Sequence, residues 1–224
     1  KNGDLNNIPD FSMIKVEVNM DENPQEILPY SDAKINTIRT AGLSAEERQV
    51  ADMFIFNCAV GLRPSELIPM RLMGYDTNAK SISIEKAVVL GEEKVTKTKK
   101  STRKIKLCGS AATIIEKHIN ISIQMGSDRI FTNPYTGKPW ASVRQFTHAL
   151  GKVFDKCGLA DEYRGIQATR HTFVTKAFDG GMTLEAIASY IGHSSVRVLE
   201  KHYLHWQSVL RGKNEINNLN SIFG

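Results

Sequence analysis

The sequence predicts an α+β fold, mostly helical, in which a helical core carries a small antiparallel β-sheet on one side. Two observations predict it. Most of the chain after residue 44 repeats apolar residues at the three- and four-residue spacing of helices. Residues 72–107 instead contain short stretches that alternate apolar and polar residues, as strands do. With 224 residues, the chain can bury one substantial core.

The composition narrows the class of protein. The 29 basic and 24 acidic residues give a net charge of +5, which mildly favours a polyanionic partner. Three cysteines without CxxC spacing argue against a disulfide framework or a zinc site and fit a reducing compartment. No apolar run reaches membrane-spanning length, so no membrane partner is expected. Because the sequence begins with Lys1, we expect a fragment of a longer protein.

Residues 1–43 are rich in Asn, Asp and Pro, which predicts a linker or N-terminal extension with one short helix near 31–40. The domain proper is expected to begin at Ser44, where a capping box starts a helix. This helix extends to Val60 and is apolar on most sides, so it belongs in the middle of the core. Gly61 stops it.

The sheet is predicted from residues 81–84 and 104–107, which alternate strictly, with a turn signal at 91–93. Residues 94–106 contain seven Lys or Arg and no acidic residue. One interpretation is a solvated edge strand protected by lysines. The other is a basic hairpin that lies against a phosphate backbone.

Helices are also predicted over residues 110–125 and 142–157. Residues 167–205 predict three more short helices, separated by Gly180-Gly181 and by a turn around His193. The remaining residues, 206–224, form a polar tail with a weak amphipathic pattern. The tail could cover its own core or dock on a neighbouring molecule.

Several polar residues stand at core-facing positions. Arg170 precedes an apolar helical stripe by three, four and seven residues, so its guanidinium should meet an anion or several acceptors. His193 follows a helix end, and Tyr203 shares a helical face with apolar residues. Arg63 stands at a helix junction, because Pro64 is well placed as the first residue of a helix.

These residue types suit one chemistry. Two arginines can grip the non-bridging oxygens of a phosphodiester, which gain charge in the transition state. A lysine can protonate the leaving oxygen, and a tyrosine oxygen can attack. At neutral pH only about one free tyrosine in a thousand is ionised, so the nucleophile needs the arginine field or a neighbouring base. No metal-binding spacing of Asp, Glu and His is visible, so we expect no metal and no cofactor.

The ordered motifs resemble the catalytic domain of the tyrosine recombinases, the phage-type integrases, over residues 44–205. The motifs are Gly61-Leu62-Arg63-Pro64-Ser65-Glu66-Leu67, Thr96-Lys97-Thr98, Arg170-His171-Thr172-Phe173-Val174-Thr175, Gly192-His193-Ser194-Ser195 and Tyr203-Leu204-His205. The resemblance implies a fold of the DNA breaking-rejoining enzyme type. It also implies that residues 1–43 follow a separate DNA-clamping domain.

The resemblance implies a role for each residue. Arg63 and Arg170 clamp the phosphate, and Lys97 is the general acid. His193 holds the phosphate and assists proton transfer, and Tyr203 forms a 3′-phosphotyrosyl link that a second DNA end can reverse without ATP. We expect Lys99, Lys100 and Arg103 to contact nucleic acid. Lys99 and Lys100 are also alternatives to Lys97.

The sequence departs from the family at Gln167, where the family has histidine in His-x-x-Arg. Gln167 and Arg170 still share a helix face. A glutamine amide can donate a hydrogen bond to phosphate but cannot carry a proton. Gln167 is therefore expected to bind in the site without acid–base work. The gap between His193 and Tyr203 is also slightly longer than usual, and Tyr190 and Tyr163 are weaker candidates for the nucleophile.

The predicted function is site-specific DNA cleavage and rejoining during integration or excision of a phage or mobile element. The resemblance implies a homo-tetramer on paired double-stranded DNA sites, in the bacterial cytoplasm at the nucleoid. Two alternatives remain open. One is relaxation of a single duplex by a type IB topoisomerase, and the other is a DNA-binding protein with decayed catalysis.

Overall fold

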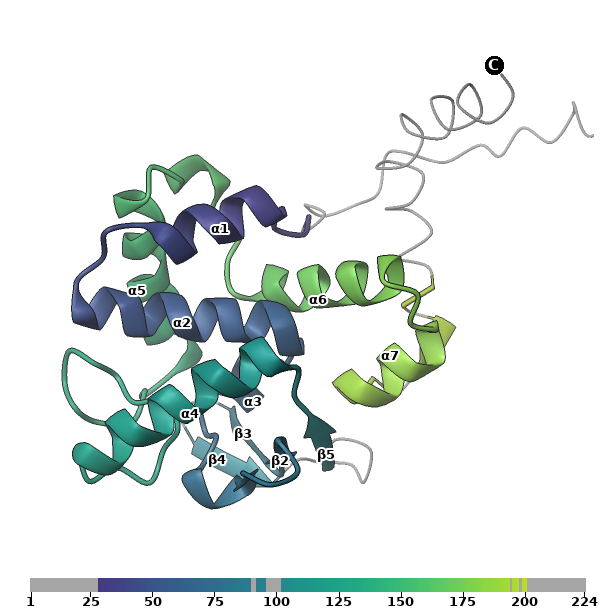
Figure 1. The fold of residues 1–224 in the computed structure, drawn as a ribbon, viewed down its shortest axis with the longest axis horizontal. Helices are drawn as coiled ribbons and strands as arrows, with labels where there is room; N and C mark the ends of the chain where they lie inside the picture. The colour runs from purple at the N-terminus through teal and green to yellow at the C-terminus, as the bar shows by residue number, and fades with distance from the viewer. Residues whose placement is uncertain (1–27, 90–91, 96–101, 194, 198, 201–224) are drawn as a thin grey trace, which may run out of the picture.

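A computed structural model describes residues 28–89, 92–95, 102–193, 195–197 and 199–200 (Figure 1). The helices are α1 (Asp32–Thr40), α2 (Ala45–Val60), α3 (Pro64–Leu67), α4 (Gly109–Gln124), α5 (Val143–Lys156), α6 (Gln167–Asp179) and α7 (Leu184–Ile191), with short 3-10 helices η2 (Leu72–Gly74) and η3 (Ala160–Glu162). The strands are β1 (Tyr75–Asp76), β2 (Ser81–Ile84), β3 (Lys86–Val89), β4 (Glu92–Val95) and β5 (Arg103–Lys106). Residues 196–197 and 199–200 are again helical.

Helix α2 forms the centre of the molecule, as its apolar pattern predicts. It packs against α1, α4, α5 and α6, and these helices surround it in Figure 1. The predicted capping box is present, because the Ser44 hydroxyl accepts from the Glu47 N–H and the Glu47 side chain accepts from the Ser44 N–H. At the other end, Gly61 adopts a left-handed conformation with φ 71°. A side chain there would collide with the ring of Phe173 in α6, because an added Cβ would lie 2.6 Å from it.

The sheet lies beside this helical core and contains the two strands that the sequence predicts. Strand β2 pairs antiparallel with β5, with Ile82 opposite Ile105, and β1 adds a short edge on the other side of β2. Both isoleucines are buried, whereas Lys104 and Lys106 of β5 are exposed. The α+β class and a small antiparallel sheet on one side of the helices are therefore as predicted.

Two details differ from the sequence prediction. Helix α1 and Tyr30 belong to the core, because Tyr30, Ile35 and Ile38 are buried in the same cluster as α2. The core thus begins before Ser44, and sequence patterning missed this because two apolar residues in a short polar helix give a weak signal. Strands β3 and β4 also pair only with each other, so they form a separate two-stranded ribbon.

Candidate active site

Arg170 is buried in α6, as its place in the apolar stripe predicts. Its side chain is 6% exposed. Its Nη1 donates to the carbonyl of Gly61 at 2.9 Å and to the carbonyl of Ile191 at 3.0 Å. These two acceptors are carbonyls at the C-terminal ends of α2 and α7, where the last turn leaves oxygens without helical partners. Arg170 therefore connects the ends of two helices that are far apart in the sequence.

Arg63 lies at the start of α3, three residues after Val60, the last residue of α2. Its Nη2 donates to the carbonyl of Gly192 at 3.2 Å, and its Nη1 forms an ion pair with Glu66 at 2.9 Å. The Arg63 side chain is 37% exposed. One face of this guanidinium is thus held by the protein while part of it stays open to solvent.

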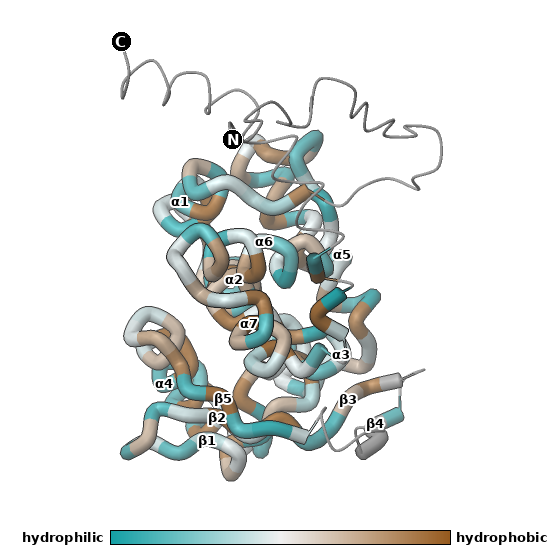
Figure 2. The backbone as a smooth tube through the Cα atoms, turned by 90° about the vertical axis from the view of Figure 1, so that its right-hand side faces the viewer, coloured by the Kyte–Doolittle hydropathy of each residue, from teal (hydrophilic) through white to brown (hydrophobic). Residues whose placement is uncertain are grey.

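Three arginines meet the end of α7, which lies between α6 and β5 in Figures 1 and 2. Arg103 donates from Nε to the carbonyl of Tyr190 at 2.9 Å. The next two carbonyls, those of Ile191 and Gly192, accept from Arg170 and Arg63. Three successive carbonyls therefore each accept from a different arginine. The negative end of the helix dipole favours cations at this place.

Glu66 forms ion pairs with two of these arginines, Arg63 and Arg103. Its side chain is 2% exposed, and its carboxylate bonds Arg63 Nη1 through Oε1 and Arg103 Nη2 through Oε2 at 3.1 Å. Burial alone would raise the pKa of Glu66. The hydrogen bonds and charge of Arg103, followed by those of Arg63, outweigh burial and hold the pKa of this carboxyl below its usual value. The ion pair of Arg63 with Glu66 is thus part of the site.

The charge of Arg170 is poorly compensated. Burial, and then the positive charge of Arg63, lower the pKa of Arg170 to about 9; Glu66 opposes this shift and Arg103 adds to it. Its Nη2 is buried and donates to no acceptor in the described part of the chain. A buried donor without a partner costs about 1–3 kcal/mol. A bound anion would supply both the missing acceptor and the missing negative charge.

His193 follows immediately after the end of α7. Gly192 ends the helix in a left-handed conformation with φ 67°, which directs the chain out of the helix at His193. The Nδ1 of His193 lies 2.9 Å from the Ser195 carbonyl and 3.3 Å from the Ser195 N–H. A proton on Nδ1 satisfies the shorter contact, and it leaves Nε2 as the acceptor nitrogen of the neutral ring. The half-buried ring is therefore positioned by its own turn.

Of the remaining predicted site residues, one is described by the structure and four lie outside the described residues. Gln167 is exposed at the first turn of α6, one turn before Arg170. The positions of Lys97, Lys99, Lys100 and Tyr203 lie outside the described residues, as does the tail 206–224. The structure thus brings together Arg63, Arg170 and His193, with Gln167 nearby on the same helix as Arg170.

Arg103 occupies a different environment from the one expected of a DNA contact. Its side chain is 8% exposed, and it packs so closely that an added Cβ on Gly192 would lie 2.7 Å from Nη1. The strand pattern does place position 103 beside exposed lysines. The same pattern could not reveal that the end of α7 covers the Arg103 side chain.

Sequence reasoning missed Asn57. This residue lies inside α2 and is fully buried. It accepts from the N–H of Leu62, donates to the Leu62 carbonyl, and donates to the hydroxyl of Thr169 at 2.7 Å. Asn57 thereby fixes the turn that carries Arg63 to the helix that carries Arg170. A polar residue within an otherwise apolar helix was the available signal.

Each of the five tyrosines that the structure describes has a pKa raised above its usual value. Burial raises the pKa of Tyr190 and of Tyr163, each to about 12. Their hydroxyls donate to the carbonyls of Lys106 and Thr147. Burial also raises the pKa of Tyr30, of Tyr75 and of Tyr135. The chain has six tyrosines, so the sixth is Tyr203.

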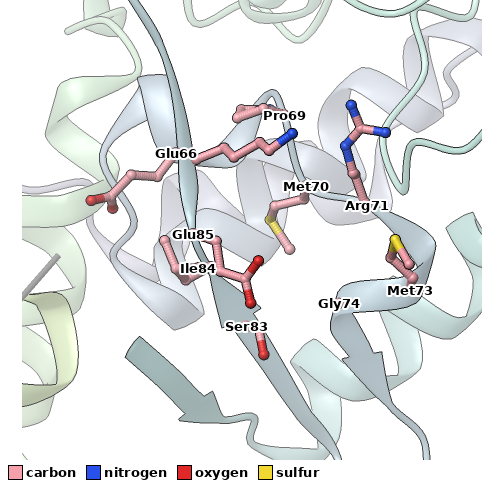
Figure 3. Close-up of a pocket in the computed structure, with 10 residues that line it drawn as sticks. Glu66, Pro69, Met70, Arg71, Met73, Gly74, Ser83, Ile84 and Glu85 are labelled. Atoms are coloured by element: carbon pink, nitrogen blue, oxygen red, sulfur yellow. The ribbon is translucent and has the colours of Figure 1, made fainter. Parts of the chain in front are cut away.

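Two hollows flank the site. One of about 430 Å³ is lined by Arg103, Ser189, Gly192 and His193, among others, and so opens beside the end of α7. The other, of about 310 Å³, lies between residues 69–74 and strand β2, as Figure 3 shows. Glu66 lies at the edge of the second hollow, with its carboxylate turned away from Arg71 and Met73 (Figure 3). This second hollow contains neither clamp arginine, so it is separate from the site.

Neither a cluster of metal-binding side chains nor a helix of membrane-spanning length occurs among the described residues. No three His, Cys, Asp or Glu side chains gather there as a metal ion would require. Within the same residues, no helix has the length and apolar character needed to cross a bilayer.

Comparison with known proteins identifies the family. A model of the phage integrase family matches residues 25–208, and the chain therefore belongs to this family. A tyrosine recombinase XerC-like protein of Caldanaerobacter subterraneus subsp. tengcongensis is 24% identical over 88% of this chain. The chain spans 55% of that relative's length. The predicted tyrosine recombinase family is thus confirmed.

Solved structures confirm the fold. The integrase of the transposon Tn1549, in complex with transposon right-end DNA, superposes with a TM-score of 0.68 at 18% identity, over 82% of this chain and 64% of that one. The XerA recombinase gives a TM-score of 0.63 at 16% identity, over 84% and 63%. The XerH recombinase, bound to a palindromic difH substrate after cleavage, gives 0.62 at 15% identity, over 87% and 54%. This chain therefore shares the mostly helical fold, with a small antiparallel sheet, of these recombinase structures.

Proposed function

We propose that this chain is the catalytic part of a site-specific DNA recombinase that cleaves and rejoins strands through a 3′-phosphotyrosyl intermediate. The observation that carries the proposal is the convergence of Arg63 and Arg170 on the end of α7, directly before His193. A backbone phosphate beside them would meet two planar, charged donors that suit its oxygens. The DNA complexes of the similar recombinases agree with this substrate class.

The arginines act on the charge of the transition state. As Tyr203 attacks phosphorus, the non-bridging oxygens gain negative charge, and Arg170 and Arg63 are already oriented to stabilise it. The Nη2 of Arg170, which has no partner among the described residues, supplies a donor for a phosphate oxygen. His193 adds a third polar group on the same side, because it follows the carbonyls that the arginines bind.

The proton and bond changes complete the step. Tyr203 Oη gives up its proton to His193 and forms a bond to phosphorus while the bond to the 5′ oxygen breaks, and Lys97 donates a proton to that leaving oxygen. The phosphotyrosyl link retains the phosphodiester bond energy. The 5′ hydroxyl of a second strand can therefore reverse the step and join the ends. Gln167 contributes a hydrogen bond to the phosphate and no proton.

The assembly follows from the same proposal. Exchange between two duplexes requires a cleaving subunit for each of four strands, so a homo-tetramer on paired double-stranded sites is the expected active form. An enzyme that acts on chromosomal or mobile-element DNA works where that DNA lies, which places the protein in the bacterial cytoplasm at the nucleoid. Lys99 and Lys100 would contact the DNA backbone near the cleaved phosphate.

A suicide substrate tests the proposal. A nick close to the cleaved phosphate lets the short fragment that carries the new 5′ hydroxyl diffuse away. The covalent complex therefore accumulates, and it migrates slowly on a denaturing gel. Full-length protein should form this complex, Tyr203→Phe should not, and the matched control Tyr190→Phe should. A complex formed by Tyr203→Phe, or none formed by the full-length protein, would refute the proposal.

The products then distinguish the reaction types. Two DNA molecules that each carry a site should exchange strands to give recombinant products. Relaxation of one supercoiled duplex without exchange would indicate topoisomerase activity, and DNA binding without either product would indicate decayed catalysis.

A further inference from the structure

Arg103 stands at the junction of the sheet with the candidate active site. It is the first residue of β5, the strand that follows the segment carrying Lys97. Its guanidinium reaches across to Glu66 of α3 and to the end of α7. The side chain is 8% exposed, which leaves little of it available to a ligand. Its neighbours Thr102 and Lys104 are both exposed.

The contacts of Arg103 lead to both halves of the phosphate clamp. Through Glu66, it reaches Arg63, because the same carboxylate bonds both arginines. Through the carbonyl of Tyr190, it holds the turn of helix that also receives Arg170 and that ends at His193. A planar guanidinium can satisfy two carboxylate oxygens and one carbonyl together, whereas an ammonium group cannot match this geometry.

The charges explain why the position requires a cation. Without Arg103, Glu66 would keep only its bonds from Arg63, whose Nη1 and backbone N–H donate to Oε1 and Oε2, and this buried carboxylate would lose one of its two positive partners. The carboxylate would then be free to draw the Arg63 guanidinium away from the Gly192 carbonyl. The Arg103 guanidinium also packs closely against Gly192, where an added Cβ would lie 2.7 Å from Nη1.

We propose that Arg103 is a positioning residue, which sets Arg63 through Glu66 and sets His193 through the end of α7, and that it does not contact DNA itself. This inference rests on the proposed recombinase function. It also replaces the role in DNA contact that the basic run of residues 94–106 suggests for this position.

The test compares Arg103→Met with Lys104→Met in the full-length protein. Lys104 is a matched control because it lies next to Arg103 on β5, carries the same charge, and has a 54% exposed side chain paired with Asp76. Three quantities are measured: the dissociation constant of the DNA complex with its salt dependence, the cleavage rate at saturating suicide substrate, and the rise in melting temperature with added sulfate.

The proposal predicts that Arg103→Met cleaves bound DNA about 10 to 100 times more slowly, consistent with the usual effect of misplacing one transition-state donor. Its DNA affinity and salt dependence should match those of the Lys104→Met variant. Combining Arg103→Met with Glu66→Gln should slow cleavage little beyond Glu66→Gln alone, because both act through one contact. If the double variant is slowed by the product of the two single factors, the two substitutions act independently and the proposal is overturned.

Other outcomes also decide against it. If Arg103→Met weakens DNA binding and lowers the salt dependence by about one phosphate contact while the saturated rate is unchanged, Arg103 contacts DNA. An unchanged rate and affinity would equally overturn the inference. If Arg103→Met does not fold, Arg103→Lys is tested in its place. Lysine keeps the positive charge but lacks the planar guanidinium, so the same loss of cleavage rate is expected.

The sulfate measurement separates this inference from the proposed function. If the wild-type protein forms no covalent complex, the recombinase proposal fails. The positioning role is then judged by sulfate alone, which should stabilise the wild type and Lys104→Met more than Arg103→Met. Equal stabilisation of all three proteins would overturn the role of Arg103.

Discussion

Replacement of Arg170 by methionine should separate the stability of the protein from its chemistry. Methionine preserves most of the apolar length of the side chain and removes the charge. Arg170 is 6% exposed, and a substitution at such a buried position ordinarily destabilises a protein by several kcal/mol. We expect a different result here, because the guanidinium itself is costly to bury.

The opposing contributions are similar in size. A pKa lowered to about 9 lies roughly three to four powers of ten below that of an ordinary arginine, which corresponds to about 4–5 kcal/mol against the charged form. The unpartnered Nη2 belongs to the same penalty. Against it stand the hydrogen bonds of Nη1 to Gly61 and Ile191, each worth about 1.5–3 kcal/mol for a charged donor. The net change in the free energy of unfolding should therefore lie within about 2 kcal/mol of zero.

Two assays measure the two consequences. Urea unfolding of Arg170→Met gives the stability, and cleavage of a suicide substrate should fall by about a hundredfold or more, as expected for the loss of a transition-state donor. Sulfate, titrated against chloride at constant ionic strength, should stabilise the wild type and not the variant, because the anion binds only the charged site.

A loss of stability above about 3 kcal/mol would show that Arg170 serves mainly to join α2, α6 and α7. Undiminished stabilisation of the variant by sulfate would show that the anion binds elsewhere. Either result would refute the reasoning that this arginine is held ready for a phosphate.

Three further predictions follow from contacts around the clamp. In Glu66→Gln, the difference in unfolding free energy from the wild type should shrink as pH falls below about 4.5, by at most about 1.4 kcal/mol per pH unit. The reason is that the pKa of Glu66 is lower in the folded protein than in the unfolded one. The stabilisation from its charge is therefore fully present above the unfolded-state pKa and is lost as pH falls through the folded-state pKa. A pH-independent difference would contradict this. Gly61→Ala should lose about 2–4 kcal/mol by urea unfolding, since it combines a left-handed backbone with a clash on Phe173, and unchanged stability would refute the close packing. Asn57→Ala should lose a similar amount because it strands the buried N–H and carbonyl of Leu62, and a loss below about 1 kcal/mol would mean that this turn finds other partners.

The sequence predicted most of the fold because its signals are local. The capping box at Ser44, the glycine after Val60 and the alternation of residues 81–84 each depend on neighbours within a few positions, and each is present in the structure. Helix α1 was assigned to a linker because its contribution to the core consists of a few apolar residues. Their burial depends on α2, which a local pattern does not reveal.

The site was predictable to the extent that unusual residues were visible. Arg170 could be found because an arginine in an apolar stripe needs a partner, and the structure provides carbonyls from two helix ends. The partners of Arg103 could not be found in this way. They come from residues 66 and 190, which only the tertiary fold brings to β5.

The most direct test of the central claim is to locate the covalent attachment of DNA to the protein. Full-length protein is trapped on a suicide substrate, digested with nuclease and protease, and the modified peptide is sequenced by mass spectrometry. We expect a 3′-phosphonucleotide on Tyr203, because this tyrosine stands in the motif that resembles the nucleophile of the family. Attachment to Tyr190, Tyr163 or any other residue, or the absence of an adduct, would contradict it.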